Sequence, residues 1–164
     1  MKNLYIIGGT MGVGKTAACV LLKRRLENAV FLDGDWCWDA NPFQVTEETK
    51  AVVLDNICHM LNNFLRCTAY QNIIFCWVMH EQEIIDSILS QLETRECNVR
   101  TISLICSSDA LTERLQKDID RGVRQPGDMA RSVDRLPMYQ KLRTVKLDVS
   151  NLTPEEAAER IAVL

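Results

Sequence analysis

The chain has 164 residues, of which 47% are hydrophobic, and its formal net charge is −3. This length favours a single domain with a sizeable core. The absence of a basic excess gives no reason to expect nucleic acid as a partner, and no apolar run is long enough to span a membrane.

The first residues lead almost directly into an apolar run, so no signal peptide is expected. The seven cysteines form no C-x-x-C pair and their number is odd, which argues against a disulfide framework. We therefore expect a cytoplasmic protein, either a monomer or a homodimer, whose partner is a small molecule.

Short apolar segments alternate with amphipathic segments along the chain, which predicts an α/β fold with a parallel sheet and helices on both of its faces. The strands are expected at residues 4–7, 29–32, 72–79, 99–106 and 144–149. The helices are expected at 17–26, from 47 to about 67, from about 80 to 92, from about 109 to 119, in a short stretch broken or started at Pro137, and from 154 onward. Thr46 and Thr153 are the predicted N-caps of two of them.

The segment between the first strand and the first helix is a phosphate-binding loop. Residues 9–16 fit the pattern G-x-x-x-x-G-K-[ST] at every fixed position. Glycines let the backbone wrap closely around an anion, and N–H groups of the loop and of the helix start bind phosphate oxygens. Lys15 is predicted to reach the β- and γ-phosphates, and Thr16 to offer its hydroxyl to Mg²⁺. The predicted nucleotide-binding residues are Gly9, Thr10, Met11, Gly12, Val13, Gly14, Lys15, Thr16 and Ala17.

Two carboxylates, Asp33 and Asp35, follow the second expected strand on either side of Gly34. In a parallel sheet this strand end lies at the same edge as the phosphate-binding loop. Phosphoryl transfer needs a group that orients the acceptor hydroxyl or takes its proton, and it needs carboxylates near the metal. A solvated acidic turn is the alternative that the residues leave open.

A Gly- and Arg-rich segment, 121–131, joins the helix after the fourth strand to the next helix. Arginines in such a segment stabilise charge on a phosphoryl group during its transfer, and closure of the segment excludes water. Arg121 and Arg124 are the first candidates for this catalytic role, and Arg131 and Arg135 are further candidates that bind substrate. The alternative is a basic loop that is simply solvated.

The order of these motifs resembles the P-loop small-molecule kinases, which include shikimate, gluconate, adenylylsulfate and nucleoside monophosphate kinases. Shikimate kinase carries D-x-D after strand two, and adenylylsulfate kinase carries D-G-D. The resemblance implies a three-layer P-loop NTPase fold over residues 1–164, a five-stranded parallel sheet in the order 2-3-1-4-5, and a lid at about 121–131. It also implies that Asp35 binds or deprotonates the acceptor, that Asp33 lies nearer the metal, and that residues 150–153 hold the adenine ring.

The chain departs from this family pattern at the end of the third strand. Many P-loop enzymes have an aspartate there that supports Mg²⁺, whereas this chain has no carboxylate until Glu81. Either the support for the metal comes from Asp33 or Asp35, or the protein binds nucleotide in a less conventional way. Trp77 is expected to reshape the acceptor pocket, which argues against shikimate itself.

Two further residues, Trp36 and His80, are candidates for acceptor binding. Trp36 adjoins Asp35, where an aromatic ring either stacks on a substrate or packs a helix against the sheet. His80 follows a strand, which places it at the functional edge, although a role in starting the next helix is equally compatible with the sequence.

These features favour an ATP- and Mg²⁺-dependent kinase that acts on a small metabolite or nucleotide-like acceptor. ATP is preferred over GTP because no N-K-x-D motif is present. The alternative is a nucleotide-binding regulatory or antibiotic-resistance protein with little transferase activity, which the missing strand-three aspartate favours. A motor-type ATPase is disfavoured because the chain is short.

Overall fold

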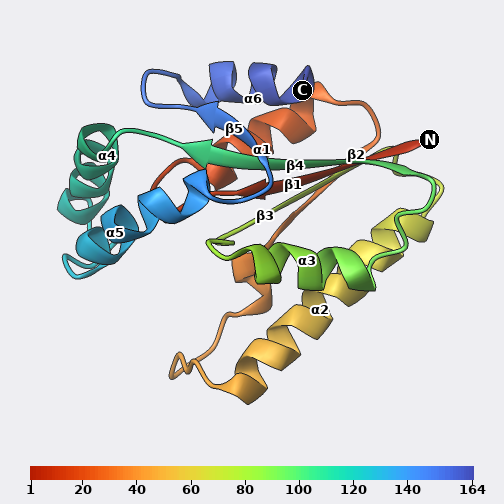
Figure 1. Cartoon of the computed structure of the whole chain (residues 1–164), viewed down its shortest axis with the longest axis horizontal. Helices are drawn as coiled ribbons and strands as arrows, with labels where there is room; N and C mark the ends of the chain where they lie inside the picture. The colour runs from red at the N-terminus through yellow and green to blue at the C-terminus, as the bar shows by residue number, and fades with distance from the viewer.

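The computed structural model describes residues 1–164 as three layers, with a central sheet between two layers of helices (Figure 1). The five strands are all parallel and follow the order β2-β3-β1-β4-β5, as expected. Their bounds are Lys2–Gly8 (β1), Ala29–Asp33 (β2), Asn72–Trp77 (β3), Cys97–Ile105 (β4) and Val145–Asp148 (β5). The α/β prediction and the predicted strand order are therefore confirmed.

Six α-helices and one short 3₁₀ helix connect the strands. Their bounds are Lys15–Arg25 (α1), Gly34–Cys37 (η1), Glu47–Arg66 (α2), Gln82–Gln91 (α3), Ser108–Asp120 (α4), Asp128–Gln140 (α5) and Pro154–Ala162 (α6). Thr46 and Thr153 form capping boxes at the starts of α2 and α6, as the sequence predicts. No helix of the chain combines the length and the apolarity that crossing a bilayer requires.

A separate hydrophobic core covers each face of the sheet. Helices α1 and α6 pack on one face around Leu22 and Ile161, while α2, α3 and the end of α5 pack on the other around Ile57 and Tyr139. The central strand β1 contributes Ile6 to one core and Ile7 to the other, because successive side chains of a strand point to opposite faces. Burial on both faces explains why β1 and β3 are nearly continuous apolar runs.

One predicted element differs from the structure. The sequence predicts a short helix that is broken or started at Pro137, but α5 runs from Asp128 to Gln140 and passes through this proline. Proline in a helix interior removes one backbone hydrogen bond and normally ends or kinks the helix. Tyr139 lies two residues beyond it and is fully buried, so packing of this side chain in the core stabilises the last turn.

The strand register brings the functional segments to one edge of the sheet. Gly8, the last residue of β1, pairs with Trp77 of β3, and Asp33, the last residue of β2, pairs with Cys76 of β3. Trp77 lies so close to Gly34 that a Cβ atom on this glycine would be 2.5 Å from Trp77 Cγ. The strand ends therefore hold the loop after β1 and the segment after β2 on either side of β3.

The contact between Gly34 and Trp77 gives a test of this arrangement. We predict that Gly34→Ala lowers the free energy of unfolding by about 1–3 kcal/mol, because the indole must move to admit the new methyl group. Gly127→Ala is the control, since a Cβ there meets nothing within 4 Å. Urea denaturation measures both variants. Equal stability of Gly34→Ala and wild type would contradict the close packing at the strand ends.

Candidate nucleotide and acceptor site

The loop between β1 and α1 has the backbone conformation of an anion-binding turn. Gly12 and Gly14 have φ angles of 84° and 105°, which other residues rarely adopt. Gly12 also lies against α4, where a Cβ would come within 2.4 Å of Leu115 Cδ2. Val13 and Thr10 are buried and anchor the loop, so its shape is fixed by packing before any ligand binds.

Helix α1 begins at this loop with its first N–H groups free of side-chain caps. Its N-cap is Gly14, which makes no side-chain hydrogen bond, and no acidic residue lies in the first turn. The positive end of the helix dipole therefore remains available to an anion. Lys15 Nζ donates to the carbonyl oxygen of Thr10 at 3.1 Å, and burial lowers the pKa of this lysine against the opposing effect of the nearby carboxylates.

Asp33 connects the two segments. Its Oδ2 accepts a hydrogen bond of 2.7 Å from Thr16 Oγ1, and its Oδ1 accepts one of 3.0 Å from the backbone N–H of Asp35. Asp33 is 5% exposed, whereas Thr16 and Asp35 are exposed, so the two bonds lie at the boundary between the core and the solvent. Asp33 thus lies against the P-loop hydroxyl, while β3 offers no carboxylate at its end.

Asp35 is placed where its charge is disfavoured. Asp35 is exposed on one side, but desolvation by the chain around it and then the Asp33 carboxylate raise its pKa above the usual value. Lys15, the polar indole edge of Trp77 and Arg124 act in the opposite direction without reversing the shift. A carboxylate with a raised pKa beside a lysine and an arginine is suited to orienting a hydroxyl group and accepting its proton.

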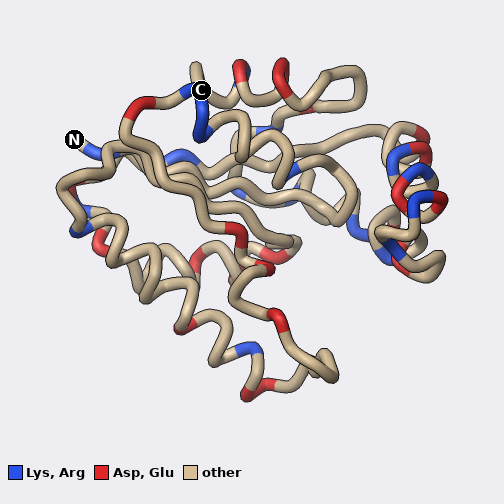
Figure 2. The backbone as a smooth tube through the Cα atoms, turned by 180° about the vertical axis from the view of Figure 1, so that it is seen from behind, with Lys and Arg blue, Asp and Glu red and all other residues tan.

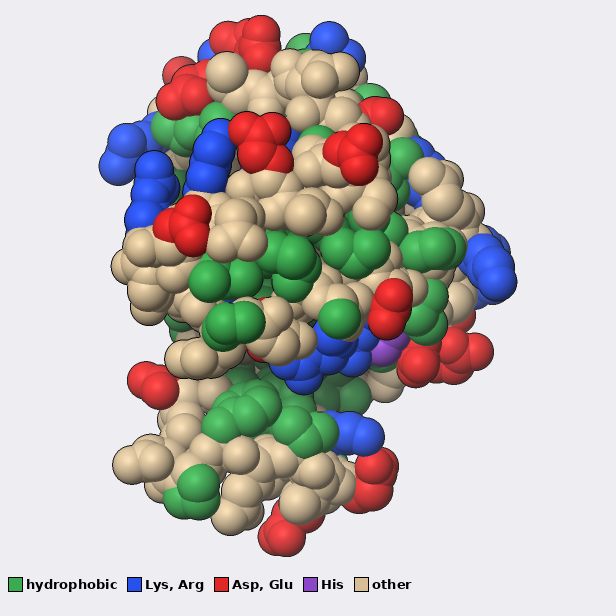
Figure 3. Space-filling model, turned by 90° about the vertical axis from the view of Figure 1, so that its left-hand side faces the viewer, with side chains coloured by type: hydrophobic (Ala, Val, Ile, Leu, Met, Phe, Trp, Pro, Cys, Tyr) green, Lys and Arg blue, Asp and Glu red, His purple; other side chains and the backbone are tan.

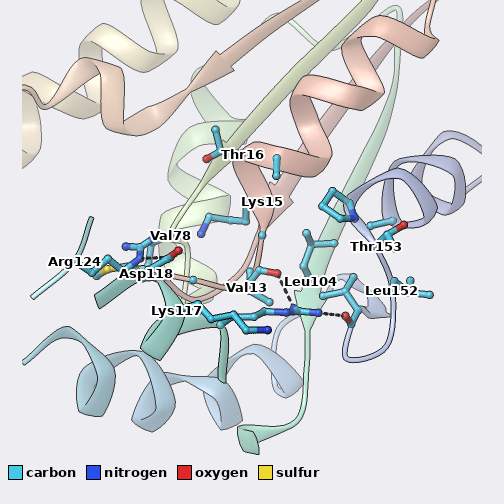
Figure 4. A pocket seen from close by; sticks show the side chains of 18 of the residues that line it. Val13, Lys15, Thr16, Val78, Leu104, Lys117, Asp118, Arg124, Leu152 and Thr153 are labelled. Atoms are coloured by element: carbon cyan, nitrogen blue, oxygen red, sulfur yellow. Dashed lines mark hydrogen bonds and ion pairs between the residues drawn. The ribbon is translucent and has the colours of Figure 1, made fainter. Parts of the chain in front are cut away.

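A cavity of about 630 Å³ runs along the loop (Figure 4). It is lined by the loop residues from Met11 to Ala17, by Asp35, and by residues of α4 and of the segment before α6. Ten of the sequence-predicted site residues meet in it: Met11, Gly12, Val13, Gly14, Lys15, Thr16, Ala17, Asp35, Arg121 and Arg124. Gly9, Thr10 and Asp33 support this set from behind without lining the cavity.

Three residues of α4 line the cavity although the sequence analysis did not single them out. They are Arg114, Lys117 and Asp118. Arg114 donates to the carbonyl oxygens of Val13 (3.1 Å) and Ser150 (3.2 Å), and so ties the loop to the segment after β5. Arg114, Lys117 and Arg121 are spaced i, i+3 and i+7, so their position on one helix face was available as a signal in the sequence.

The predicted lid arginines differ in their contacts. Residues 121–127 form the loop after α4, and residues 128–131 are the first turn of α5. Arg124 Nε is paired with Asp118 Oδ2 at 3.0 Å, whereas Arg131 is paired with Asp128 on its own helix. Figure 2 shows Lys and Arg interspersed with Asp and Glu in this end of the molecule.

The aromatic side chains after β2 lie on opposite faces of the sheet. Trp36 is 60% exposed and packs edge-on against Phe31, whose side chain belongs to the core under α1. Trp38 instead packs with Trp77 on the other face, with ring centroids 6.3 Å apart. Trp36 is next to Asp35 in the sequence, but it lies on the face of the sheet opposite Trp77. Trp38 lies on the same face as Trp77 and contacts it.

The oxygen atoms at the loop fit a magnesium ion that is held mainly by phosphates and water. Thr16 Oγ1 and the Asp33 carboxylate are hard oxygen ligands within hydrogen-bond distance of one another. The chain contains no cluster of three or more His, Cys, Asp or Glu side chains that would hold a metal alone. This is the usual situation for Mg²⁺, which binds through one or two protein groups together with substrate phosphates.

The fold and the loop define a P-loop nucleotide-binding domain with the three-layer fold of the small-molecule kinases. Residues 6–134 match the family described as AAA domain, and the chain belongs to that family. No curated protein matches the sequence at a significant level.

Several solved structures share the fold over almost the whole chain. A tunicamycin resistance protein of Deinococcus radiodurans has 20% identity and a TM-score of 0.72, with 99% of this chain and 95% of that chain covered. A gluconokinase of Sinorhizobium meliloti has 16% identity and a TM-score of 0.72, with coverage of 98% and 90%. The APS kinase CysC of Mycobacterium tuberculosis has 13% identity and a TM-score of 0.66, with coverage of 98% and 95%. At these identities the similarity establishes the fold.

The raised pKa of Asp35 predicts a stability change. In the folded chain ionisation of Asp35 is disfavoured, so the wild type loses stability as the pH rises through this pKa. Asparagine cannot ionise, and Asp35→Asn is therefore expected to raise the melting temperature of the ligand-free protein at neutral pH. The difference should shrink as the pH falls and Asp35 becomes protonated in the wild type.

Thermal unfolding followed between about pH 4 and about pH 8 measures this difference. Asp39→Asn, at an exposed carboxylate just beyond η1, is the matched control. A lower melting temperature of Asp35→Asn than of wild type at neutral pH would show that Asp35 is stabilised by its surroundings and would contradict the assignment.

Proposed function

We propose that this protein is an ATP- and Mg²⁺-dependent phosphotransferase that acts on a small metabolite or nucleotide-like acceptor. The observation that carries the proposal is that Asp35 lines the same cavity as the phosphate-binding loop and the arginines after α4. A protein that only binds nucleotide needs the loop, but it has no need for a carboxylate of raised pKa facing it. The kinase fold of the solved relatives supports the same conclusion.

The loop is the proposed site of the ATP phosphates. N–H groups of the loop and of the α1 start bind the phosphate oxygens, and Lys15 reaches the β- and γ-phosphates. The segment after β5, with Leu152 and Thr153 in the cavity wall, holds the adenine ring. Arg114 fixes this segment relative to the loop, because it donates to carbonyl oxygens of both.

Thr16 and Asp33 are the proposed magnesium-supporting residues. A bound Mg²⁺ neutralises the charge of the β- and γ-phosphate oxygens. Asp33 can serve in place of an aspartate at the end of β3, since its Oδ2 already lies 2.7 Å from the Thr16 hydroxyl. Asp33 also orients the backbone of Asp35 through the hydrogen bond to its N–H group.

Asp35 is the proposed acceptor-binding residue and general base. Its raised pKa brings it nearer to neutrality, where a base is more effective in taking a proton from a hydroxyl group. Arg121 and Arg124 stabilise the transferred phosphoryl group, and segment 121–131 acts as a lid that excludes water. Trp36, His80, Arg131 and Arg135 are the further proposed acceptor contacts.

A second candidate function is a nucleotide-binding regulatory or resistance protein with little transferase activity. Two observations favour it: the end of β3 carries no carboxylate, and one solved structure of the same fold is a tunicamycin resistance protein. This alternative predicts nucleotide binding and slow hydrolysis that no acceptor stimulates.

The loop assignment is tested by Lys15→Ala. We expect kcat/KM for ATP to fall by about 10²-fold or more, because removing the ammonium removes charge stabilisation of the transferred group. Lys23→Ala, at an exposed lysine of the same helix, should retain wild-type values. Release of ADP is the measurement. Full ATP affinity and turnover in Lys15→Ala would mean that the loop does not bind the nucleotide.

The choice between the two functions is tested by a screen of hydroxylated metabolites and nucleotides for stimulation of ADP release. A kinase shows stimulation by at least one acceptor, and Asp35→Asn reduces that stimulated rate by about 10²–10⁴-fold while nucleotide binding persists. Hydrolysis that no compound stimulates would instead support the regulatory alternative. Unchanged transfer in Asp35→Asn would exclude Asp35 as the base.

A further inference from the structure

Three buried polar side-chain atoms of the chain lack a hydrogen-bond partner: Ser132 Oγ, Tyr139 OH and His80 Nδ1. Ser132 is 1% exposed and Tyr139 is 0% exposed. Leaving a buried donor unpaired typically costs a folded protein about 1–3 kcal/mol, so each such group calls for an explanation. All three belong to α5 or to the segment that follows β3.

Arg135 lies between the two α5 residues. Ser132, Arg135 and Tyr139 are spaced i, i+3 and i+7 and share one face of the helix. Long helical side chains lean toward the helix N-terminus, which directs Tyr139 toward the turn of Arg135. Burial lowers the pKa of His80, and the charge of Arg135 lowers it further. Burial raises the pKa of Tyr139, and the charge of Arg135 opposes this rise.

Arg135 has no acidic partner within the chain. The ion pairs of this region join Arg124 to Asp118 and Arg131 to Asp128, and Arg135 takes part in none. A half-buried guanidinium without an acidic partner shares its helix face with two unpaired hydroxyl groups, and together they form a set of hydrogen-bond donors that lacks an anion. Such a set is suited to a negatively charged group, which accepts several hydrogen bonds at once.

This group of residues lies next to the phosphate-binding loop but outside the nucleotide cavity. The carbonyl oxygen of Ser132 accepts a hydrogen bond of 2.8 Å from Thr10 Oγ1 of the loop, and this bond is buried. None of Ser132, Arg135, Tyr139 and His80 lines the cavity along the loop. Ser132 therefore joins this group to the loop outside the nucleotide cavity, on the side of the sheet where Tyr139, Trp38 and Trp77 share one core.

A row of aromatic rings borders the same side. Trp77 packs against Gly34 beside Asp35, Trp38 lies 6.3 Å from Trp77, and Phe43 lies 5.2 Å from Trp38 between ring centroids. Phe43, at the outer end, is 62% exposed. Figure 3 shows a hollow in this face of the molecule, with hydrophobic side chains on its lower wall and basic side chains above them.

We propose that the phosphoryl acceptor is a hydroxylated compound that carries both a flat aromatic part and a negatively charged group. The aromatic part packs on the Trp77–Trp38–Phe43 row, and the anionic group binds Arg135, Ser132, Tyr139 and His80. The acceptor hydroxyl then lies at Asp35, between the two. This inference rests on the proposed kinase function and narrows its substrate class. It distinguishes the acceptor from polyols and sugar acids, which have no aromatic face.

The test compares four sets of acceptor probes in the ADP-release assay, with binding followed separately by quenching of tryptophan fluorescence. The sets are aromatic hydroxy acids, neutral aromatic alcohols, gluconate as a polyol acid, and sorbitol as a neutral polyol. Nucleoside monophosphates form a further arm that separates a phosphate from a carboxylate as the anion. We expect the aromatic anions to exceed every other set in kcat/KM by at least about tenfold.

Two variants separate the two halves of the proposal. Arg135→Gln should raise KM for aromatic anions by at least about tenfold and leave neutral aromatic alcohols unaffected. Trp38→Leu should weaken the binding of aromatic compounds and leave the binding of gluconate unchanged. Tyr139→Phe and Ser132→Ala keep the core packing, and each should weaken the binding of anionic probes several-fold. Arg143→Gln, at an exposed arginine paired with Asp86, is the charge-matched control.

A higher kcat/KM for gluconate or sorbitol than for aromatic anions would overturn the inference while leaving the kinase function intact. The same conclusion would follow if Arg135→Gln raised KM equally for charged and neutral probes. If no probe stimulates ADP release, the kinase proposal fails for these classes and the fluorescence titration decides the inference. Binding of aromatic anions that depends on Arg135 would then support the site, and absence of such binding would refute it.

Discussion

The hydrogen bond from Thr16 Oγ1 to Asp33 Oδ2 joins the two segments on which the whole site depends. Thr16 is the last residue of the loop motif and lies in the first turn of α1, and Asp33 ends β2, two strands away from β1 in the sheet. The bond is short because parallel strands bring both segments to the same edge, with Asp33 in register with Cys76 of β3. Asp33 then also fixes Asp35 through the Asp35 N–H group. One buried carboxylate therefore positions the phosphate-binding loop and Asp35 relative to each other.

The charges at this edge are arranged for function at a cost in stability. Asp33 and Asp35 repel each other, and burial of Lys15 disfavours its ammonium form. On α5, Ser132 and Tyr139 keep buried hydroxyl groups without partners. A stable core would avoid all of these features, so their concentration at one edge is typical of a functional site. Bound phosphates, a magnesium ion and an anionic acceptor would supply the missing partners.

The fold and the position of the loop between β1 and α1 could be predicted well from the sequence, because both depend on local patterns. The apolar strands give the α/β alternation, and G-x-x-x-x-G-K-T defines a loop whose shape depends on few contacts outside it. Asp33 and Asp35 are predicted to follow a strand, but only the structure shows that Asp33 is the one bonded to Thr16. That choice depends on side-chain directions after β2, which periodicity does not determine.

The remaining parts depend on tertiary packing that no local pattern encodes. Pro137 predicts a helix boundary, but burial of Tyr139 carries α5 past it. Arg114 resembles any surface arginine of an amphipathic helix until the structure places it against Val13 and Ser150. The sequence favours Trp36 because it adjoins Asp35, but the 3₁₀ helix between β2 and α2 sends Trp36 and Trp38 to opposite faces of the sheet.

The account is tested most directly by identifying where the γ-phosphoryl group of ATP goes. Phosphorus NMR of reactions that contain ATP, Mg²⁺ and single members of a library of hydroxylated metabolites distinguishes a phosphate ester from inorganic phosphate. Our account predicts a phosphate ester that forms in step with ADP for at least one acceptor and is lost in Asp35→Asn. Formation of inorganic phosphate alone, at the same rate with every compound and in both proteins, would contradict it.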